Sequence, residues 1–193
     1  MTRVFWVRHG PTHAKGMVGW TDLPADLSDA AQVARLSAYL PASAVVVAST
    51  LQRASATADA LQGRRTRLPD DPDLREMHFG DWEMKTSDEI SSTHPDLSRA
   101  FWTDPGAARP PGGESWDDLT ARTTRGLNRA MAAHPGADIV AVAHIGAILA
   151  QVAACTGTPP RDVLRHRIEN LSVTELTLEP DGGWRLGRIS HCP

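Results

Sequence analysis

The stretch that decides the fold is Val4-Phe5-Trp6-Val7, followed directly by Arg8-His9-Gly10-Pro11-Thr12. Four apolar residues before a charged, glycine-containing turn are typical of a buried strand whose carboxyl end opens into a loop. In an open α/β sheet, ligands bind at that position. The guanidinium of Arg8 can grip phosphate oxygens in a fork, and the imidazole of His9 can act as acid, base or nucleophile. The stretch therefore predicts a phosphoryl site at the end of the first strand.

The rest of the chain alternates short apolar runs with helical periods. Strands are expected at Arg3–Val7, Ala44–Ala48, Arg65–Leu68 and Ile139–Ala143, with a closing hairpin of Ser172–Leu178 and Trp184–Ile189 around Asp181-Gly182-Gly183. Helices are expected at Ser28–Leu40, with Ser28 as N-cap, and at Leu51–Leu61 and Gly146–Cys155. Strands alternating with helices predict a three-layer αβα architecture with a mostly parallel central sheet.

The stretch from about Asp70 to Ser115 breaks this alternation. It is rich in proline and glycine, and we interpret it as an insertion with short helices such as Thr86–Ser92 rather than as a linker between domains. A long helix, Trp116–His134, is expected after it. We therefore expect one domain over residues 1–193, with an irregular insertion at about 70–115 that covers the active site.

Composition limits the classes of function. The 193 residues are 41% hydrophobic and 22% charged, which is ordinary for a soluble globular protein. A formal net charge of −3 argues against a large nucleic-acid-binding face. No apolar run approaches the roughly 18 residues of a membrane span, and only four apolar residues precede Arg8, so we expect no signal peptide. Cys155 and Cys192 lack Cys-x-x-Cys spacing, and we expect both to be reduced in a cytoplasmic protein.

Three segments carry polar side chains directly after a predicted strand. They are Arg8-His9, Ser49-Thr50-Leu51-Gln52-Arg53 and His144-Ile145-Gly146. If the three strands are neighbours in one sheet, their carboxyl ends bring Arg8, His9, Arg53 and His144 into one pocket. Arg53 and Gly146 also fall at helix starts, where unpaired N–H groups and the helix dipole favour a phosphate.

Each of these residues has a simpler interpretation. A single Arg after a strand is more often part of a surface ion pair, and a single His there is more often a hydrogen-bonded structural residue. Three strand ends in one chain that each carry Arg or His are harder to explain in this way, although spacing alone leaves the functional and the structural interpretations about even. The remaining histidines are interpreted mostly as surface or structural residues. No zinc-type spacing of His, Cys or Glu is present, so no metal is expected.

A fourth segment, Leu74-Arg75-Glu76-Met77-His78-Phe79-Gly80-Asp81-Trp82-Glu83, opens the insertion. A Glu held against aromatic side chains has the raised pKa that a general acid needs. The alternative is an acidic surface loop pinned by Phe79 and Trp82, and composition alone favours this alternative.

In combination, these segments resemble the histidine phosphatase superfamily, the phosphoglycerate mutase-like proteins. The Arg8–Thr12 stretch is similar to the family's Arg-His-Gly-Glu-Thr signature, and the likeness extends over nearly the whole chain. Further similar segments are Gly19-Trp20-Thr21-Asp22-Leu23-Pro24, Ser49–Ala58, Leu74–Glu83, Pro111-Gly112-Gly113-Glu114-Ser115 and Val142-Ala143-His144.

The resemblance implies a phosphoglycerate mutase-like fold and a role for each candidate residue. His9 would be the nucleophile that becomes a phosphohistidine. Arg8, Arg53 and His144 would clamp the phosphate oxygens, with a further hydrogen bond from Thr12. Glu76 would protonate the leaving alcohol and then activate water. No cofactor is implied, and the expected partner is a small phosphorylated metabolite. Neither nucleic acid nor membrane is expected as a partner, while a homodimer is left open.

The chain departs from the family pattern at four positions. Ile145 follows the second histidine where Gly is usual, and Met84 follows the Trp-Glu pair where Gly is usual. Gly is also usual near Ala31, and Lys15 stands where many mutases have Asn. None of the four removes a catalytic group, so they bear on the shape of the substrate rather than on the chemistry.

Three functions are compatible with this pattern. The first is hydrolysis of a phosphomonoester, and the α-ribazole phosphatases are the closest in pattern. The second is a cofactor-dependent phosphoglycerate mutase, which needs cations for a second acidic group, whereas the insertion offers only Arg75, Lys85, Arg99 and Arg109. The third is a non-catalytic phosphate- or phosphoprotein-binding module, which the presence of both His9 and Glu76 disfavours.

Overall fold

A computed structural model describes all 193 residues. Its centre is a six-stranded sheet in the order β3-β2-β4-β1-β5-β6. The strands are β1 (Thr2–Arg8), β2 (Val45–Ala48), β3 (Thr66–Arg67), β4 (Ile139–Ala143), β5 (Val173–Leu178) and β6 (Trp184–Leu186). The first four are parallel, and β5 and β6 add an antiparallel hairpin at the β1 side. The mostly parallel sheet and the closing hairpin are confirmed.

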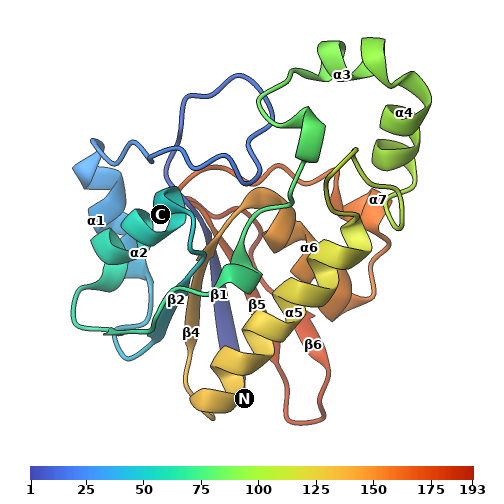
Figure 1. The fold of residues 1–193 in the computed structure, drawn as a ribbon. Coiled ribbons are helices and arrows are strands. Elements are labelled where there is room, and N and C mark those ends of the chain that lie inside the picture. Colours follow the sequence, from blue (N-terminus) through green and yellow to red (C-terminus); the bar gives the residue numbers. More distant parts are fainter.

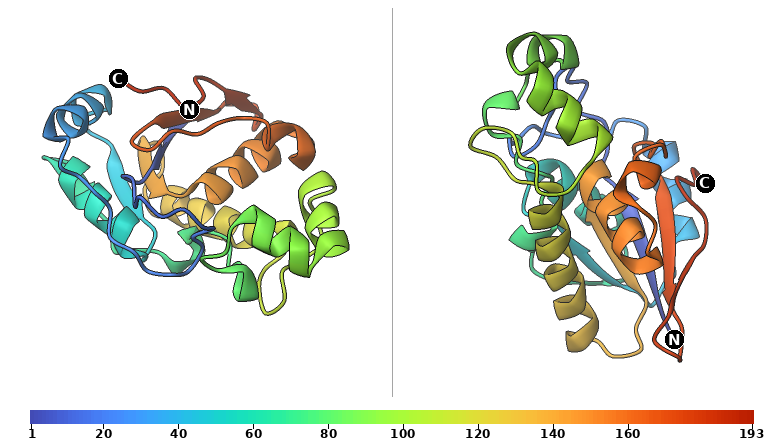
Figure 2. Two further views of the ribbon diagram at one scale, coloured as in Figure 1. Left: turned by 90° about the horizontal axis from the view of Figure 1, so that it is seen from above. Right: turned by 90° about the vertical axis from the view of Figure 1, so that its right-hand side faces the viewer.

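Helices cover both faces of this sheet, as Figures 1 and 2 show. On one face lie α1 (Ala30–Tyr39) and α2 (Gln52–Gln62). On the other lie α5 (Trp116–Ala133) and α6 (Ile145–Thr156), followed by the short α7 (Pro160–Val163). Because successive side chains of a strand point to opposite faces, β1 contributes Phe5 and Val7 to one apolar core and Val4 and Trp6 to the other. The α/β fold class is therefore confirmed.

The insertion contains more regular structure than its composition predicts. It holds 3₁₀ turns at Pro72–Leu74 and Gly80–Trp82, and two helices, α3 (Ser87–Thr93) and α4 (Pro95–Thr103). Only the first of these helices is predicted from the sequence. Pro95, which looks like a helix breaker, occupies the first position of α4, where its missing N–H costs nothing.

Several element boundaries differ from the predicted ones. The N-cap of α1 is Asp29 and not Ser28, because the Asp29 carboxylate accepts the N–H of Gln32 at 2.9 Å while the Ser28 N–H donates to Asp26. The strand predicted at 65–68 shortens to β3, and α6 begins one residue before Gly146. None of the helices is both long enough and apolar enough to cross a membrane.

Candidate active site

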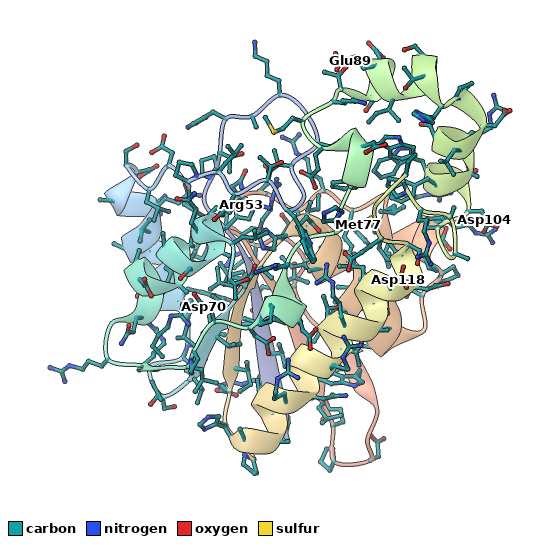
Figure 3. All side chains as sticks on the ribbon, viewed as in Figure 1. Arg53, Asp70, Met77, Glu89, Asp104 and Asp118 are labelled. Carbon is teal, nitrogen blue, oxygen red and sulfur yellow. The ribbon has the colours of Figure 1, made fainter.

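The carboxyl ends of β2, β4 and β1 lie side by side at one edge of the sheet. Residue pairs Arg8–Ala143 and Ala48–Val142 are in register across these strands. The three strand ends that carry the predicted Arg and His residues therefore meet as expected. A cavity of about 370 Å³ opens at this edge, and its lining includes Arg53 and Met77, which are labelled in Figure 3. Of the predicted site residues, the cavity is lined by Arg8, His9, Thr12, Arg53 and Glu76.

His9 is held in one orientation and one tautomer. Its Nδ1 lies 2.6 Å from the carbonyl oxygen of Gly10, which can only accept, so Nδ1 carries the hydrogen. Its Nε2 accepts from Nε of Arg53 at 3.2 Å and therefore holds the lone pair. Burial, with a 7% exposed side chain, and the nearby Arg53 charge lower the pKa of His9 to about 3. The ring is therefore neutral, with Nε2 available as a nucleophile.

The backbone around His9 is tied to three other elements. The His9 N–H donates to Ala143 of β4 at 3.1 Å, and the His9 carbonyl accepts from the Asn170 side chain at 2.8 Å. The next N–H, that of Gly10, donates to Oγ1 of Thr57 in α2 at 3.1 Å. These bonds fix the position of the backbone from which the His9 imidazole extends. Neither Asn170 nor Thr57 is assigned a role in the site by the sequence analysis.

Arg53 lies in the first turn of α2 and is only 1% exposed. Besides His9, it donates to the carbonyl of Thr21 at 2.9 Å and that of Gly19 at 2.6 Å. Burial lowers its pKa, an effect that Glu76 opposes. The guanidinium is thus aimed at the His9 ring by two neutral acceptors and has no direct carboxylate partner that would compete with a phosphate.

Arg8 is the second arginine that lines the cavity, together with Arg53. One of its terminal nitrogens donates to the carbonyl of Ile168, and its buried Nε has no hydrogen-bond partner. Burial lowers its pKa, and the charge of Glu76 works against that shift. Arg8 therefore retains donor capacity for an oxyanion.

His144 adjoins His9 but is not among the residues that line the cavity. It is fully buried, its ring centroid is 5.0 Å from that of His9, and its Nε2 lies 2.8 Å from Oγ of Ser49. Its Nδ1 has no partner. Burial, followed by the influence of His9 and Arg53, lowers the pKa of His144 well below its usual value. The ring is therefore neutral and, at Nδ1, has unused hydrogen-bonding capacity.

Glu76 is buried, with 3% of its surface exposed, and Trp82 is fully buried. The interpretation of Leu74–Glu83 as an acidic surface loop is therefore wrong. The two Glu76 carboxylate oxygens accept the N–H groups of Met77 at 2.9 Å and Gly146 at 3.1 Å. Burial raises the pKa of Glu76 despite these bonds. A Cβ at position 146 would overlap with the carboxylate, so the glycine leaves room for it.

Arg122 is the site residue that the sequence analysis misses. It is buried in α5 and donates to the carbonyl of Glu76 at 2.7 Å, and to the carbonyls of Asp73 and Arg75 at 2.9 and 2.7 Å. Its other contacts are two 2.8 Å bonds to the carboxylate of Glu114. The Pro-Gly-Gly-Glu-Ser segment could have signalled a partner for Glu114, but nothing local marks Arg122 among the other arginines of its helix.

Glu83 organises the loop that positions Arg53. It accepts the N–H groups of Gly19, Trp20 and Thr21 at 3.0, 2.8 and 3.2 Å, and that of Phe79 at 3.1 Å. Burial alone would raise the pKa of Glu83, but these bonds outweigh it and lower the pKa. Gly19 and Thr21 present their carbonyls to Arg53. Glu83, an acidic residue of the insertion, therefore indirectly holds the Arg53 guanidinium in place.

The positions that depart from the family pattern have different surroundings. Ile145 lines the cavity and packs against the core, whereas exposed Lys15 does not line it. Met84 has φ of +63°, a conformation that glycine adopts more easily. His166 is exposed, as expected for a surface residue, and it also lines the cavity, which the sequence analysis did not predict. No group of three or more His, Cys, Asp or Glu residues is arranged to hold a metal ion.

Comparison with known proteins identifies the family of the chain. Residues 4–190 match the profile of the Histidine phosphatase superfamily (branch 1). An adenosylcobalamin/alpha-ribazole phosphatase of Salmonella typhimurium is 30% identical over 173 residues, 86% of each chain. A glucosyl-3-phosphoglycerate phosphatase of Mycolicibacterium vanbaalenii is 34% identical over 171 residues, 81% of this chain and 75% of that one. The chain belongs to the histidine phosphatase superfamily, and the resemblance seen in its motifs is confirmed.

The similarity extends to solved structures and to longer proteins. The structure of Bacillus stearothermophilus YhfR superposes with a TM-score of 0.89 and 29% identity, covering 100% of this chain and 98% of that one. The chain is also 32% identical over 201 residues to the bifunctional protein Rv2228c of Mycobacterium tuberculosis, with 96% of the chain covered. It spans about half the length of that relative, 53%.

Proposed function

We propose that the protein hydrolyses phosphomonoesters of small metabolites through a phosphohistidine on His9. The observation that carries the proposal is the neutral His9 ring, with its Nε2 lone pair directed at Arg53 and with Glu76, whose pKa is raised, lining the same cavity. Nucleophile, cation and proton donor are thus within reach of one bound phosphoryl group. That combination separates a catalyst from a module that only binds phosphate.

In the first step, phosphate oxygens bind between Arg8 and Arg53, and the Arg53 N–H now on His9 Nε2 turns to an oxygen. Nε2 is freed and attacks phosphorus as the P–O bond to the alcohol breaks. Glu76 gives its proton to the departing oxygen. The Gly10 carbonyl, already bonded to Nδ1–H, stabilises the positive charge that develops on the ring. Nδ1 of His144 has no partner and belongs to a ring that adjoins His9, so we propose it as a further donor once a phosphoryl group is held at His9.

In the second step, the carboxylate of Glu76 takes a proton from water, the oxygen attacks phosphorus, and the P–N bond to His9 breaks. The proton that Glu76 takes from water restores its acid form, so the protein is back in its starting state when inorganic phosphate leaves. No step uses a metal ion, so the activity is expected to be metal-independent.

Hydrolysis is favoured over mutase chemistry by the positions of the cations in the insertion. Arg99 pairs with Asp96, Arg109 pairs with Asp118, and Arg75 donates to Thr50 and lies over the Trp20 ring. None of them, nor Lys85, lines the cavity. A second acidic group would find no cation there of the kind that a phosphoglycerate mutase needs. Among phosphatase substrates, α-ribazole phosphate is our first candidate, on the name of the Salmonella relative.

The test is turnover of p-nitrophenyl phosphate with and without EDTA, followed by trapping with labelled substrate. We expect phosphate release that EDTA leaves unchanged, and an acid-labile, base-stable label on His9. Label on Asp, Ser or Cys155 would refute the mechanism, and loss of activity in EDTA would show that a metal takes part. Efficient bisphosphoglycerate-dependent interconversion of phosphoglycerates, with phosphate release only as a leak, would establish the mutase instead.

A further inference from the structure

The cavity has two chemically different parts. The ionisable groups lie together at the sheet edge, where Arg8, His9 and Arg53 come from the ends of β1 and β2 and the residues after them, and Glu76 comes from the start of the insertion. Most of the remaining lining is apolar and comes from the insertion, the start of α5, α6 and the segment after α7. The large apolar side chains among these residues include Phe79, Phe101, Trp102, Trp116, Ile145 and Leu164. At about 370 Å³, the space suits a small ligand and exceeds what a phosphoryl group alone would fill.

The apolar part is packed in place. Phe101 of α4 is buried and makes edge-on contacts with Trp82 and Trp102, at ring-centroid distances of 5.4 and 4.8 Å. Trp102 is 42% exposed. In Figure 1, α4 stands above α6 and α7, and the side chains of Ile145 and Leu164 from that side line the same cavity. Trp102 therefore combines lining of the cavity with access to solvent, as a residue at its mouth would.

Charge in this part is scarce. Outside the four ionisable groups of the sheet edge, the only titratable side chain that lines the cavity is His166. A carboxylate or second phosphate placed here would lose its hydration without gaining an ion pair, and a polyhydroxy group would lose hydrogen bonds to water with few in return. An aromatic or aliphatic group would instead bury its surface against side chains of its own kind.

We propose that these residues form a subsite for an apolar leaving group. The substrate class is then a phosphomonoester with one anionic group. Its alcohol carries an aromatic ring or an aliphatic chain, which lies between Trp102 on one side and a wall formed by the side chains of Ile145 and Leu164 on the other. Ile145, which stands where the family pattern has Gly, belongs to this wall and is a specificity residue of this chain. The inference rests on the proposed hydrolysis and adds the chemistry of the leaving alcohol.

The test uses primary alkyl phosphates from ethyl to hexyl. Their leaving groups have nearly constant acidity, so differences in kcat/KM report binding of the chain and not bond breaking. Each methylene that the subsite buries is expected to raise kcat/KM by roughly two- to fourfold. Butyl phosphate should exceed glycerol phosphate and 3-phosphoglycerate by at least about tenfold, because those two carry polar groups where the wall offers no partner.

Two variants locate the effect. Trp102→Ala and Ile145→Ala should each reduce the gain per methylene, and Trp102, being half exposed, can be replaced with little harm to the fold. Arg99→Ala is the matched control, because it lies on the same helix, outside the cavity, in an exposed ion pair. It should keep the wild-type dependence on chain length.

A flat response to chain length, or equal use of glycerol phosphate, in a protein that still hydrolyses p-nitrophenyl phosphate would overturn the subsite and leave the proposed function intact. A full response to chain length in both variants would also overturn it, because the chain would then bind elsewhere. Absence of phosphate release from every ester, in protein with a normal unfolding transition, would instead refute the proposed function.

Discussion

Arg8 and His9 are positioned by the sheet, whereas Glu76 is positioned by other side chains. Arg8 is the last residue of β1 and His9 follows it directly, so the register of β1 with β4 fixes their depth and direction. Glu76 lies in an irregular segment, and its backbone carbonyl accepts from Arg122 and from Nε1 of Trp20, each at 2.7 Å. A strand end is thus positioned mainly by its ladder of backbone bonds, with side chains such as Asn170 and Thr57 adding to it, whereas a loop-borne catalytic group depends on a few long-range polar contacts.

This contrast predicts different sensitivities to mutation. Changes at the strand ends should remove chemical groups and leave the scaffold intact. Changes around Glu76 should displace a group that is still present. Kinetics with leaving groups of different acidity separates the two outcomes, because only the second depends on where a proton donor lies.

The largest effect is expected for His9→Ala, because it deletes the nucleophile. Turnover should fall by about 10⁴-fold or more, while the unfolding temperature stays near or above that of the wild type, since the neutral ring is buried beside cations. Steady-state assays and thermal unfolding measure both quantities. Substantial residual activity accompanied by a covalent label at another residue would contradict the assignment.

Arg53→Ala should cost about 10²–10³-fold in kcat/KM, as expected for a lost transition-state donor. Arg65→Ala is the control, because Arg65 is another buried arginine that binds the carbonyls of Ser37, Leu40 and Pro41, away from the cavity. It should lower the unfolding temperature with little effect on kcat/KM of the folded protein. Similar kinetic losses in both variants would mean that Arg53 acts only through the fold. Arg8→Ala and His144→Ala are expected to behave like Arg53→Ala.

Glu76→Gln should slow alkyl phosphates by about 10²–10⁴-fold and p-nitrophenyl phosphate far less in the phosphorylation step. In the wild type, the proton donor is the acid form, which is lost as pH rises through the raised pKa of Glu76. Single-turnover rates with an alkyl phosphate should therefore fall on the alkaline side of that pKa, and the variant should lack this limb. Equal slowing of both substrates would assign Glu76 to positioning alone.

Arg122→Lys tests the contacts that hold the Glu76 segment. Lysine keeps the charge but has no fork to bridge Glu114 and three carbonyls, so the carboxyl group should shift and turnover of alkyl phosphates should fall about 10- to 100-fold. Turnover of p-nitrophenyl phosphate should fall less. An equal loss of turnover for both substrates, in parallel with a fall in unfolding temperature, would show that Arg122 only stabilises the fold.

The smallest effect is on stability at mild acidity. His9 and His144 both have folded pKa values below the ordinary 6.5, to about 3 for His9, because burial disfavours their charged forms. Below pH 6.5 the unfolded chain binds protons at these residues that the folded chain does not, so the unfolding temperature should decline from pH 6.5 to 4.5. Asp118 and Glu83, with lowered pKa values, titrate below this window, whereas Glu76, whose pKa is raised in the folded protein, opposes the decline produced by the two histidines. The decline should be smaller in His9→Gln, and an identical decline would contradict the assignment.

The sequence by itself determined the order of strands and helices, the strand-end positions of the candidate residues and the family. Apolar runs such as Val4–Val7 and Ile139–Ala143 bury both faces of a strand in whatever context they occur, and the polar residues that follow are carried to one sheet edge. Local sequence signals predicted element boundaries less well, because a single hydrogen bond can decide them. At the start of α1, the N-cap is Asp29 and not the expected Ser28.

The tertiary structure alone decided which side chains support the insertion and what they enclose. Whether Glu76 is a surface carboxylate or a buried proton donor depends on Arg122 and Gly146, which lie 46 and 70 residues away along the chain. The same holds for His144, which follows β4 at the sheet edge as predicted but is buried beside His9 and is not part of the cavity lining. Burial and long-range hydrogen bonds arise only when distant segments meet, and they set both the pKa of Glu76 and the apolar character of the cavity wall.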